Sequence, residues 1–144
     1  MGEVRPVWRV SRWDGQTGRV RTDRRTELLA VSAGGAVGAL VRYAAFAVWP
    51  TRSGGFPWAT FAVNVTGCLL IGLSMALVTP RLWRVFLGPG LLGGFTTFST
   101  YAEEVRALLD WARPGTAVAY LAATVLAALA AVAAGGWLAR RARR

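Results

Sequence analysis

The residues best suited to chemistry in this 144-residue chain are polar side chains inside long apolar stretches. Asn64 lies in the middle of one stretch. Tyr120 and Thr124 lie four residues apart in another, which places both hydroxyls on one helix face. These stretches are long enough to cross a membrane. A polar group in the middle of a membrane needs a hydrogen-bond partner, because leaving it unsatisfied costs several kcal/mol. Asn64 therefore either bonds to a neighbouring helix or replaces part of the hydration shell of an ion. The two hydroxyls either bond to a neighbouring helix or line a polar track.

The stretch Gly88–Tyr101 is unusual for a membrane span, because it contains four Gly, one Pro, three Thr and one Ser. In a helix interior, Gly costs about 1 kcal/mol and Pro about 3 kcal/mol relative to Ala. We therefore predict a broken helix at Gly93–Thr97, whose freed carbonyl oxygens suit a cation. Beyond the break, Phe98 and Tyr101 share a helix face. They are either a packing pair or present their positive ring edges to an anion.

Several residue types needed for enzyme chemistry are missing. The chain has no His, no Lys and a single Cys, so a nucleophile–base pair and a cysteine metal cluster are not expected. We predict that the chain is not an enzyme. Its net charge of +10 would suggest nucleic acid in a soluble protein, but the charges lie outside the apolar stretches. We expect a membrane protein with no nucleic-acid partner.

The apolar stretches predict an all-α membrane protein with four transmembrane helices. Three of them hold 22, 22 and 23 residues, and Arg42 is their only charge, whereas a bilayer core needs about 20 residues of helix. Five tryptophans fall at the predicted span edges, where amphipathic rings prefer to lie. The four-helix transmembrane domain is predicted at 28–139, with spans at about 28–49, 57–78, 83–109 and 116–138. It is flanked by a basic, disordered tail (1–27) and a basic C-terminal tail (140–144).

Arginine counts predict the orientation of these spans in the cell membrane. The tail, the loop after the second span and the C-terminus together carry thirteen arginines, and the opposite side carries three. Because positive residues stay cytoplasmic, both termini are expected inside. Arg42 lies within the first span and either snorkels to the interface or attracts anions at a pore mouth. Gly34 and Gly38 in the same span fit a close helix–helix contact.

With these residues identified, the chain resembles the CrcB/Fluc family of fluoride channels over about residues 30–140. The resemblance rests on Gly34-Gly-Ala-Val-Gly-Ala-Leu-Val-Arg42-Tyr43, on Val63-Asn64-Val-Thr-Gly-Cys68 and on Gly93-Gly-Phe-Thr-Thr-Phe-Ser-Thr100. It implies a fluoride-selective channel that passively exports fluoride from the cytoplasm. It also implies an antiparallel dimer with two pores and a structural sodium ion at the dimer interface.

The resemblance also assigns roles to residues of this chain. The sodium ligands would be the backbone carbonyls of Gly93 and Thr96. Arg42 and Glu104 match positions at the pore mouth or in its structural surroundings. Tyr101 stands where the family usually has Phe, which adds a hydroxyl beside the ion path. The fluoride pore would be lined by Asn64, Phe98, Tyr101, Tyr120 and Thr124.

The strong arginine bias suggests a single orientation in the membrane, so we hypothesise a dimer with an oppositely oriented homologue. Membrane lipid is a second expected partner of the chain. Two alternatives compete with the channel. A small four-helix multidrug exporter should need a titratable carboxylate within a span, yet the seven acids lie in the tail or near the membrane edge after the third span. A non-transporting membrane assembly subunit would not explain a hydroxyl-rich third span.

Overall fold

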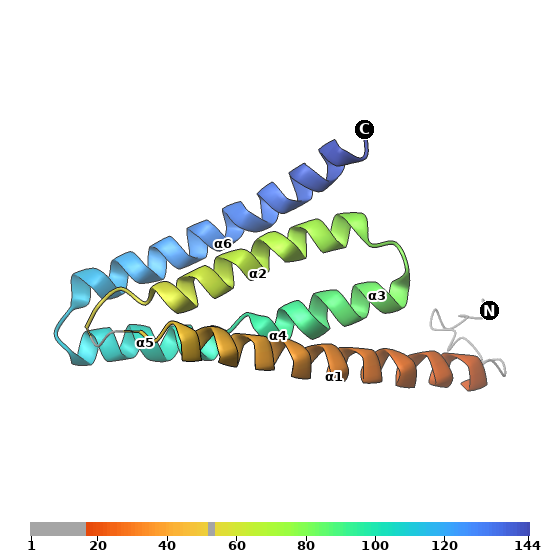
Figure 1. The fold of residues 1–144 in the computed structure, drawn as a ribbon, viewed down its shortest axis with the longest axis horizontal. Helices are drawn as coiled ribbons and strands as arrows, with labels where there is room; N and C mark the ends of the chain where they lie inside the picture. The colour runs from red at the N-terminus through yellow and green to blue at the C-terminus, as the bar shows by residue number, and fades with distance from the viewer. Residues whose placement is uncertain (1–16, 52–53) are drawn as a thin grey trace, which may run out of the picture.

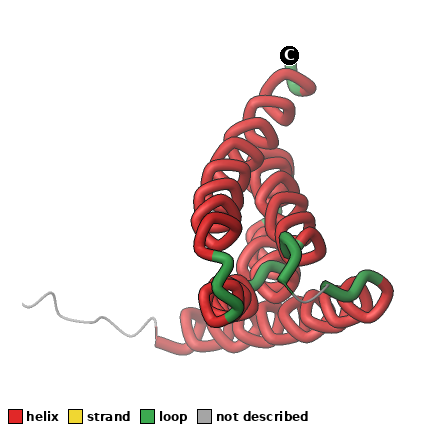
Figure 2. The backbone as a smooth tube through the Cα atoms, turned by 90° about the vertical axis from the view of Figure 1, so that its left-hand side faces the viewer, coloured by secondary structure: helices red, strands yellow, loops and turns green. Residues whose placement is uncertain are grey.

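The computed structural model describes residues 17–51 and 54–144, with side chains from Arg24 onward. Within these residues the protein consists of helices and loops, without a strand (Figures 1 and 2). This confirms the all-helical prediction. The elements are α1 (Thr17–Val48), α2 (Trp58–Leu77), α3 (Arg81–Val85), the π-helix η1 (Phe86–Leu92), α4 (Gly93–Phe95), α5 (Phe98–Asp110) and α6 (Pro114–Ala142).

Three of these helices are long and apolar enough to cross a bilayer. They comprise residues Arg24–Val48 of α1, all of α2 and all of α6. Many of their large apolar side chains are exposed on the single chain, including Leu40, Leu126 and Leu129. A lipid environment would cover such side chains, so the helices support a multi-pass membrane protein.

The first and last helices extend beyond the predicted spans. Helix α1 begins at Thr17 rather than near Leu28, so residues 17–27 are helical and the prediction of a disordered tail is wrong for them. Residues 1–16 of that predicted tail lie outside the described residues. Helix α6 continues to Ala142, so the first arginines of the predicted C-terminal tail belong to its last turn.

The third apolar stretch is divided among several short elements. Pro89 lies inside η1, where the wider π turn accommodates a residue that has no N–H and would crowd an α-helix. The Gly93 N–H donates to Gly88 O, five residues back, as a π turn requires. Thr96 and Thr97 are extended, with ψ angles of 156° and 123°. Helix α5 then restarts with Thr97 as its N-cap, whose hydroxyl accepts from the Thr100 N–H.

Glycines bring the long helices close to their neighbours. A Cβ at Gly34 or Gly38 of α1 would collide with backbone atoms of η1, at Phe86 O and Leu91 O. The close contact predicted for these two glycines is therefore confirmed. In the same way, Gly72 of α2 faces Val132 O and Gly135 of α6 faces Leu69 O, so these two helices cross at their glycines. Small residues permit this approach where lipid supplies no hydrophobic drive.

The start of α1, the connection from α2 to α3 and the end of α6 lie toward the same end of the molecule (Figure 1). Two contacts hold this end together. Arg81 Nε pairs with Glu27 Oε1 at 2.6 Å, and Arg143 Nη2 donates to Leu77 O at 2.6 Å. The ends of the described chain therefore lie on one side, as predicted.

Candidate functional site

Asn64 of α2 is buried and bonds to the backbone of Thr97 across the bundle. Its Nδ2 donates to Thr97 O at 3.0 Å, and its Oδ1 accepts from the Thr97 N–H at 2.8 Å. The amide thus pairs with both backbone groups of one residue, as the opposite residue of an antiparallel strand would. Of the two interpretations of Asn64, the structure shows the interhelical hydrogen bond.

This pairing changes the bonding of two carbonyls that were predicted as cation ligands. In a continuous α-helix, the Thr97 N–H would donate to Gly93 O and the Thr100 N–H to Thr96 O. Here the first N–H is directed to Asn64 and the second to the Thr97 hydroxyl. Gly93 O and Thr96 O are therefore released from these helical bonds, and Gly93 is exposed on the single chain.

Arg42 of α1 reaches the released carbonyl of Thr96. Its Nη1 donates to Thr96 O at 2.9 Å, and the side chain is partly buried. The guanidinium therefore points to the third segment, and the expectation that it snorkels to the interface is wrong. A charged donor on a carbonyl gives a stronger hydrogen bond than a neutral one.

Glu104 of α5 is the acceptor for three hydroxyls from different elements. Tyr120 OH donates to Oε2 at 2.7 Å, and Thr60 Oγ1 donates to Oε1 at 2.9 Å. Thr51 Oγ1 donates to the same Oε1 at 3.3 Å. The cluster joins the loop after α1 to α2, α5 and α6. It stabilises a half-buried carboxylate without a cationic partner among the described residues.

Aromatic rings form a continuous series beside this cluster. The Phe98 and Tyr101 centroids are 5.8 Å apart, those of Tyr101 and Tyr120 are 5.2 Å apart, and those of Tyr120 and Phe56 are 5.2 Å apart. Phe98 is 80% exposed on the single chain, whereas Tyr101 and Tyr120 are buried. The extra hydroxyl of Tyr101 donates to Leu121 O of α6 at 3.0 Å. The predicted pair, Phe98 and Tyr101, is in contact, but the Phe98 ring is exposed on the surface of the single chain.

Thr124 lies one turn after Tyr120 on α6. Its Oγ1 is buried and has no hydrogen-bond partner within residues 24–51 and 54–144. Tyr120 and Thr124 share a face as the spacing predicts, but only the first hydroxyl is bonded. A buried hydroxyl without a partner costs about 1–3 kcal/mol, so it is suited to a visiting ligand.

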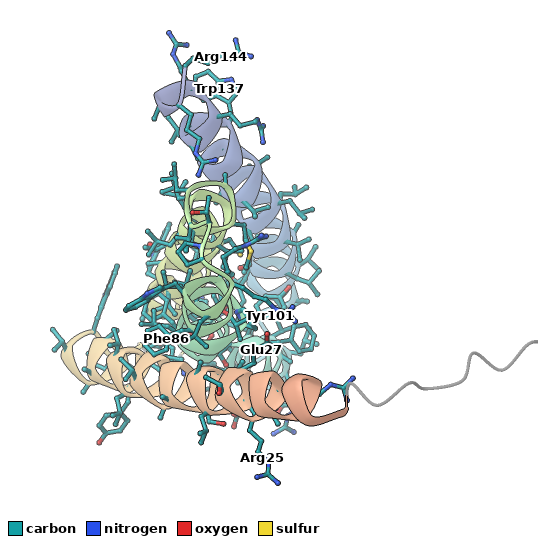
Figure 3. All side chains as sticks on the ribbon, turned by 90° about the vertical axis from the view of Figure 1, so that its right-hand side faces the viewer. Arg25, Glu27, Phe86, Tyr101, Trp137 and Arg144 are labelled. Atoms are coloured by element: carbon teal, nitrogen blue, oxygen red, sulfur yellow. The ribbon has the colours of Figure 1, made fainter. Side chains whose placement is uncertain are left out.

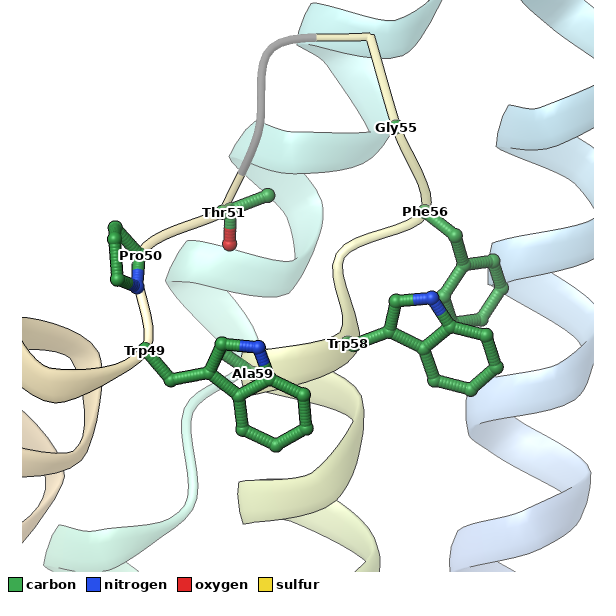
Figure 4. Close-up of a pocket in the computed structure, with 7 residues that line it drawn as sticks. All are labelled: Trp49, Pro50, Thr51, Gly55, Phe56, Trp58 and Ala59. Carbon is green, nitrogen blue, oxygen red and sulfur yellow. The ribbon is translucent and has the colours of Figure 1, made fainter.

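A hollow of about 520 Å³ opens at the loop between α1 and α2, close to the Glu104 cluster. Figure 4 shows its lining: Trp49, Pro50, Thr51, Gly55, Phe56, Trp58 and Ala59. Thr51 bonds to Glu104, and the Phe56 ring contacts Tyr120. The hollow is therefore lined in part by residues that contact the candidate site.

Sequence reasoning missed three contributors to this site. The backbone of Thr97 is the partner of Asn64, and Thr51 and Thr60 bond to Glu104. Thr60 is four residues before Asn64 and shares its helix face, so the spacing carried a signal for this residue. Thr51 lies in a loop, where no periodicity marks it.

Comparisons with known proteins identify a family and several relatives of this chain. Residues 29–136 match the family described as CrcB-like protein, Camphor Resistance (CrcB). The chain is 58% identical over 118 residues to fluoride-specific ion channel FluC 2 of Nocardia farcinica, covering 78% of this chain and 84% of the relative. It is 52% identical over 125 residues to fluoride-specific ion channel FluC 2 of Streptomyces avermitilis, covering 83% and 74%. It is 55% identical over 116 residues to fluoride-specific ion channel FluC 1 of Streptomyces coelicolor, covering 77% of this chain and 75% of the relative.

Proposed function

The chain belongs to the CrcB family, and from this membership we propose that it is a fluoride-selective channel of the cell membrane. It would export fluoride passively and lower its toxicity. The observation that carries the proposal is the 52–58% identity to three relatives named fluoride-specific ion channels, over more than three quarters of this chain.

The unbonded hydroxyl of Thr124 supports a route for fluoride through the chain. A desolvated anion needs hydrogen-bond donors, and this hydroxyl is buried with its donor unused among the described residues. Tyr120 lies one helical turn before Thr124, its ring contacts Tyr101, and Tyr101 contacts Phe98; aromatic edges are positive. We place the fluoride path along Thr124 and these rings, with the hollow at Trp49–Ala59 as its mouth. Asn64 would contribute its second amide hydrogen.

Physical chemistry makes a passive channel sufficient. Hydrogen fluoride is a weak acid that crosses membranes uncharged and dissociates in a near-neutral cytoplasm, which traps fluoride inside. An inside-negative potential favours the exit of an anion by about 2.3 kcal/mol per charge per 100 mV. No energy-coupling site is required.

The released carbonyls of Gly93 and Thr96 support a sodium site in a broken third span. Carbonyl oxygens of interrupted membrane helices are suitable sodium ligands, and these two lack their helical donors. A bound sodium ion would supply a fixed positive charge that links the third span of one chain to the third span of its partner. Gly93 and Phe98 are exposed on the single chain, so a second chain in a dimer would add further oxygens to this pair and complete the site. The Arg42 guanidinium on Thr96 O would keep this carbonyl oriented.

The arginine distribution supports both termini in the cytoplasm. The end of the molecule that holds the α6 terminus and the α2–α3 connection carries most of the arginines. A chain with this bias inserts in one direction. We therefore infer that an antiparallel dimer pairs it with an oppositely oriented homologue.

Growth of a bacterium without its own fluoride channels tests this proposal. Cells that express the chain together with an oppositely biased homologue should grow at fluoride concentrations that stop empty cells. The Thr124→Val variant should lose most of this protection while reaching the membrane in equal amount. Equal fluoride sensitivity with and without the expressed pair would refute the channel. Full protection by the chain alone would refute the obligatory homologue.

A further inference from the structure

The tip of α6 carries a basic cluster that fluoride transport does not use. Trp137, Arg140, Arg141 and Arg144 line a hollow of about 450 Å³, and all four are exposed. Trp137 and Arg144 lie at the far end of α6, well away from Tyr101 of the candidate site (Figure 3). The cluster is therefore separate from the fluoride path.

The length of α6 places this cluster at the level of lipid headgroups. The helix has 29 residues, which corresponds to about 44 Å at 1.5 Å per residue. A bilayer has an apolar core of about 30 Å and is about 40–45 Å thick with its headgroups. With the apolar part of α6 centred in the core, its last turn reaches the phosphate layer. Trp137 then lies in the interface, where tryptophan is enriched.

The arginines of the cluster lack acidic partners in the part of the chain that the structure describes. The ion pairs found there join Arg81 to Glu27 and Arg106 to Asp110. α6 contains no Asp or Glu. The Arg141 guanidinium lies over the Trp137 ring, with 5.4 Å between its Cζ and the ring centroid, which fixes its position. The cluster is thus a group of uncompensated, partly ordered cations.

We propose that Arg140, Arg141 and Arg144, together with Trp137, bind the phosphate of an anionic phospholipid. Guanidinium groups match phosphate oxygens with paired N–H donors. Toward the middle of the bilayer from the cluster, α6 exposes Leu129 and Leu126 near the same helix face, and these side chains would contact the acyl chains. A cationic head site continuous with an apolar helix face fits an amphiphile better than a free phosphate ion.

Native mass spectrometry of the full chain in detergent, titrated with phosphatidylglycerol, tests this assignment. The triple variant R140Q/R141Q/R144Q should bind phosphatidylglycerol at least about tenfold more weakly, because each arginine near a membrane surface contributes severalfold to binding. The matched control R106Q/R113Q removes two arginines from the opposite end and should bind as wild type does. Circular dichroism in lipid-free detergent should show equal helix content in all three proteins.

Two further binding measurements identify the chemical class of the ligand. Phosphatidylcholine, which has the same phosphate but no net charge, should bind wild type and triple variant alike. Inorganic phosphate should not displace phosphatidylglycerol. Affinity for phosphatidylglycerol within twofold of wild type in the triple variant would overturn the site, as would an equal loss in the control. Complete displacement by inorganic phosphate would overturn the lipid as its ligand. These binding readouts do not depend on fluoride transport.

Discussion

Replacing Asn64 with alanine tests whether its amide holds the third segment in an extended conformation. The side chain donates to Thr97 O at 3.0 Å and accepts from the Thr97 N–H at 2.8 Å, and both residues are buried. In Asn64→Ala, two buried backbone groups lose their partner. Each such loss costs about 1–3 kcal/mol. We therefore expect the free energy of unfolding to fall by about 2–6 kcal/mol.

The assay is unfolding of the full chain in detergent micelles by added SDS, followed by tryptophan fluorescence. Ser74→Ala is a matched control on the same helix, because Ser74 Oγ donates only to Ile71 O within α2, at 3.1 Å. This local bond contributes little, so the control should stay within about 0.5 kcal/mol of wild type. A loss in Asn64→Ala no larger than in Ser74→Ala would refute the reasoning. Fluoride efflux should fall in Asn64→Ala and not in Ser74→Ala.

Three further predictions concern the packing, the carboxylate cluster and the ion path. Gly38→Ala should reduce the yield of folded protein, because the added Cβ meets Leu91 O. In the control Gly115→Ala the added Cβ enters open space, so the yield should stay unchanged; size-exclusion profiles measure the folded yield of each variant. A double-mutant cycle of Tyr120→Phe and Glu104→Gln should give a coupling of about 0.5–3 kcal/mol in SDS unfolding, and a value near zero would contradict the 2.7 Å bond. Thr124→Val should raise the unfolding free energy by about 1–3 kcal/mol, because it removes a buried hydroxyl without a hydrogen-bond partner, yet lower fluoride efflux severalfold; unchanged efflux would exclude Thr124 from the path.

The sequence was sufficient to predict an all-helical, multi-pass membrane protein, because length and hydropathy alone decide whether a helix can span a bilayer. The close approach at Gly34 and Gly38 was also predictable, since small residues spaced four apart mark a helix contact. The start of α1 at Thr17 was not. Residues 17–27 are polar and charged, so hydropathy ends the span near Leu28 although the helix continues.

The candidate site was harder to predict, because its bonds join residues far apart in the chain. The need of Asn64 for a partner followed from its depth, but Thr97 lies 33 residues away, and nothing local identifies it. The contact of Arg42 with Thr96 O spans 54 residues, and snorkelling seemed equally reasonable from the sequence. Gly34 of α1 approaches Phe86 O of the π-helix, another contact between distant segments that the local sequence does not identify.

The most direct test of the central claim is anion efflux from liposomes that contain the chain co-purified with an oppositely biased homologue. Fluoride and chloride electrodes would follow both ions under an imposed potassium diffusion potential. The account predicts rapid release of fluoride, retention of chloride, and a severalfold slower fluoride release when this chain carries Thr124→Val. Release of chloride as fast as fluoride, or retention of both ions, would contradict it.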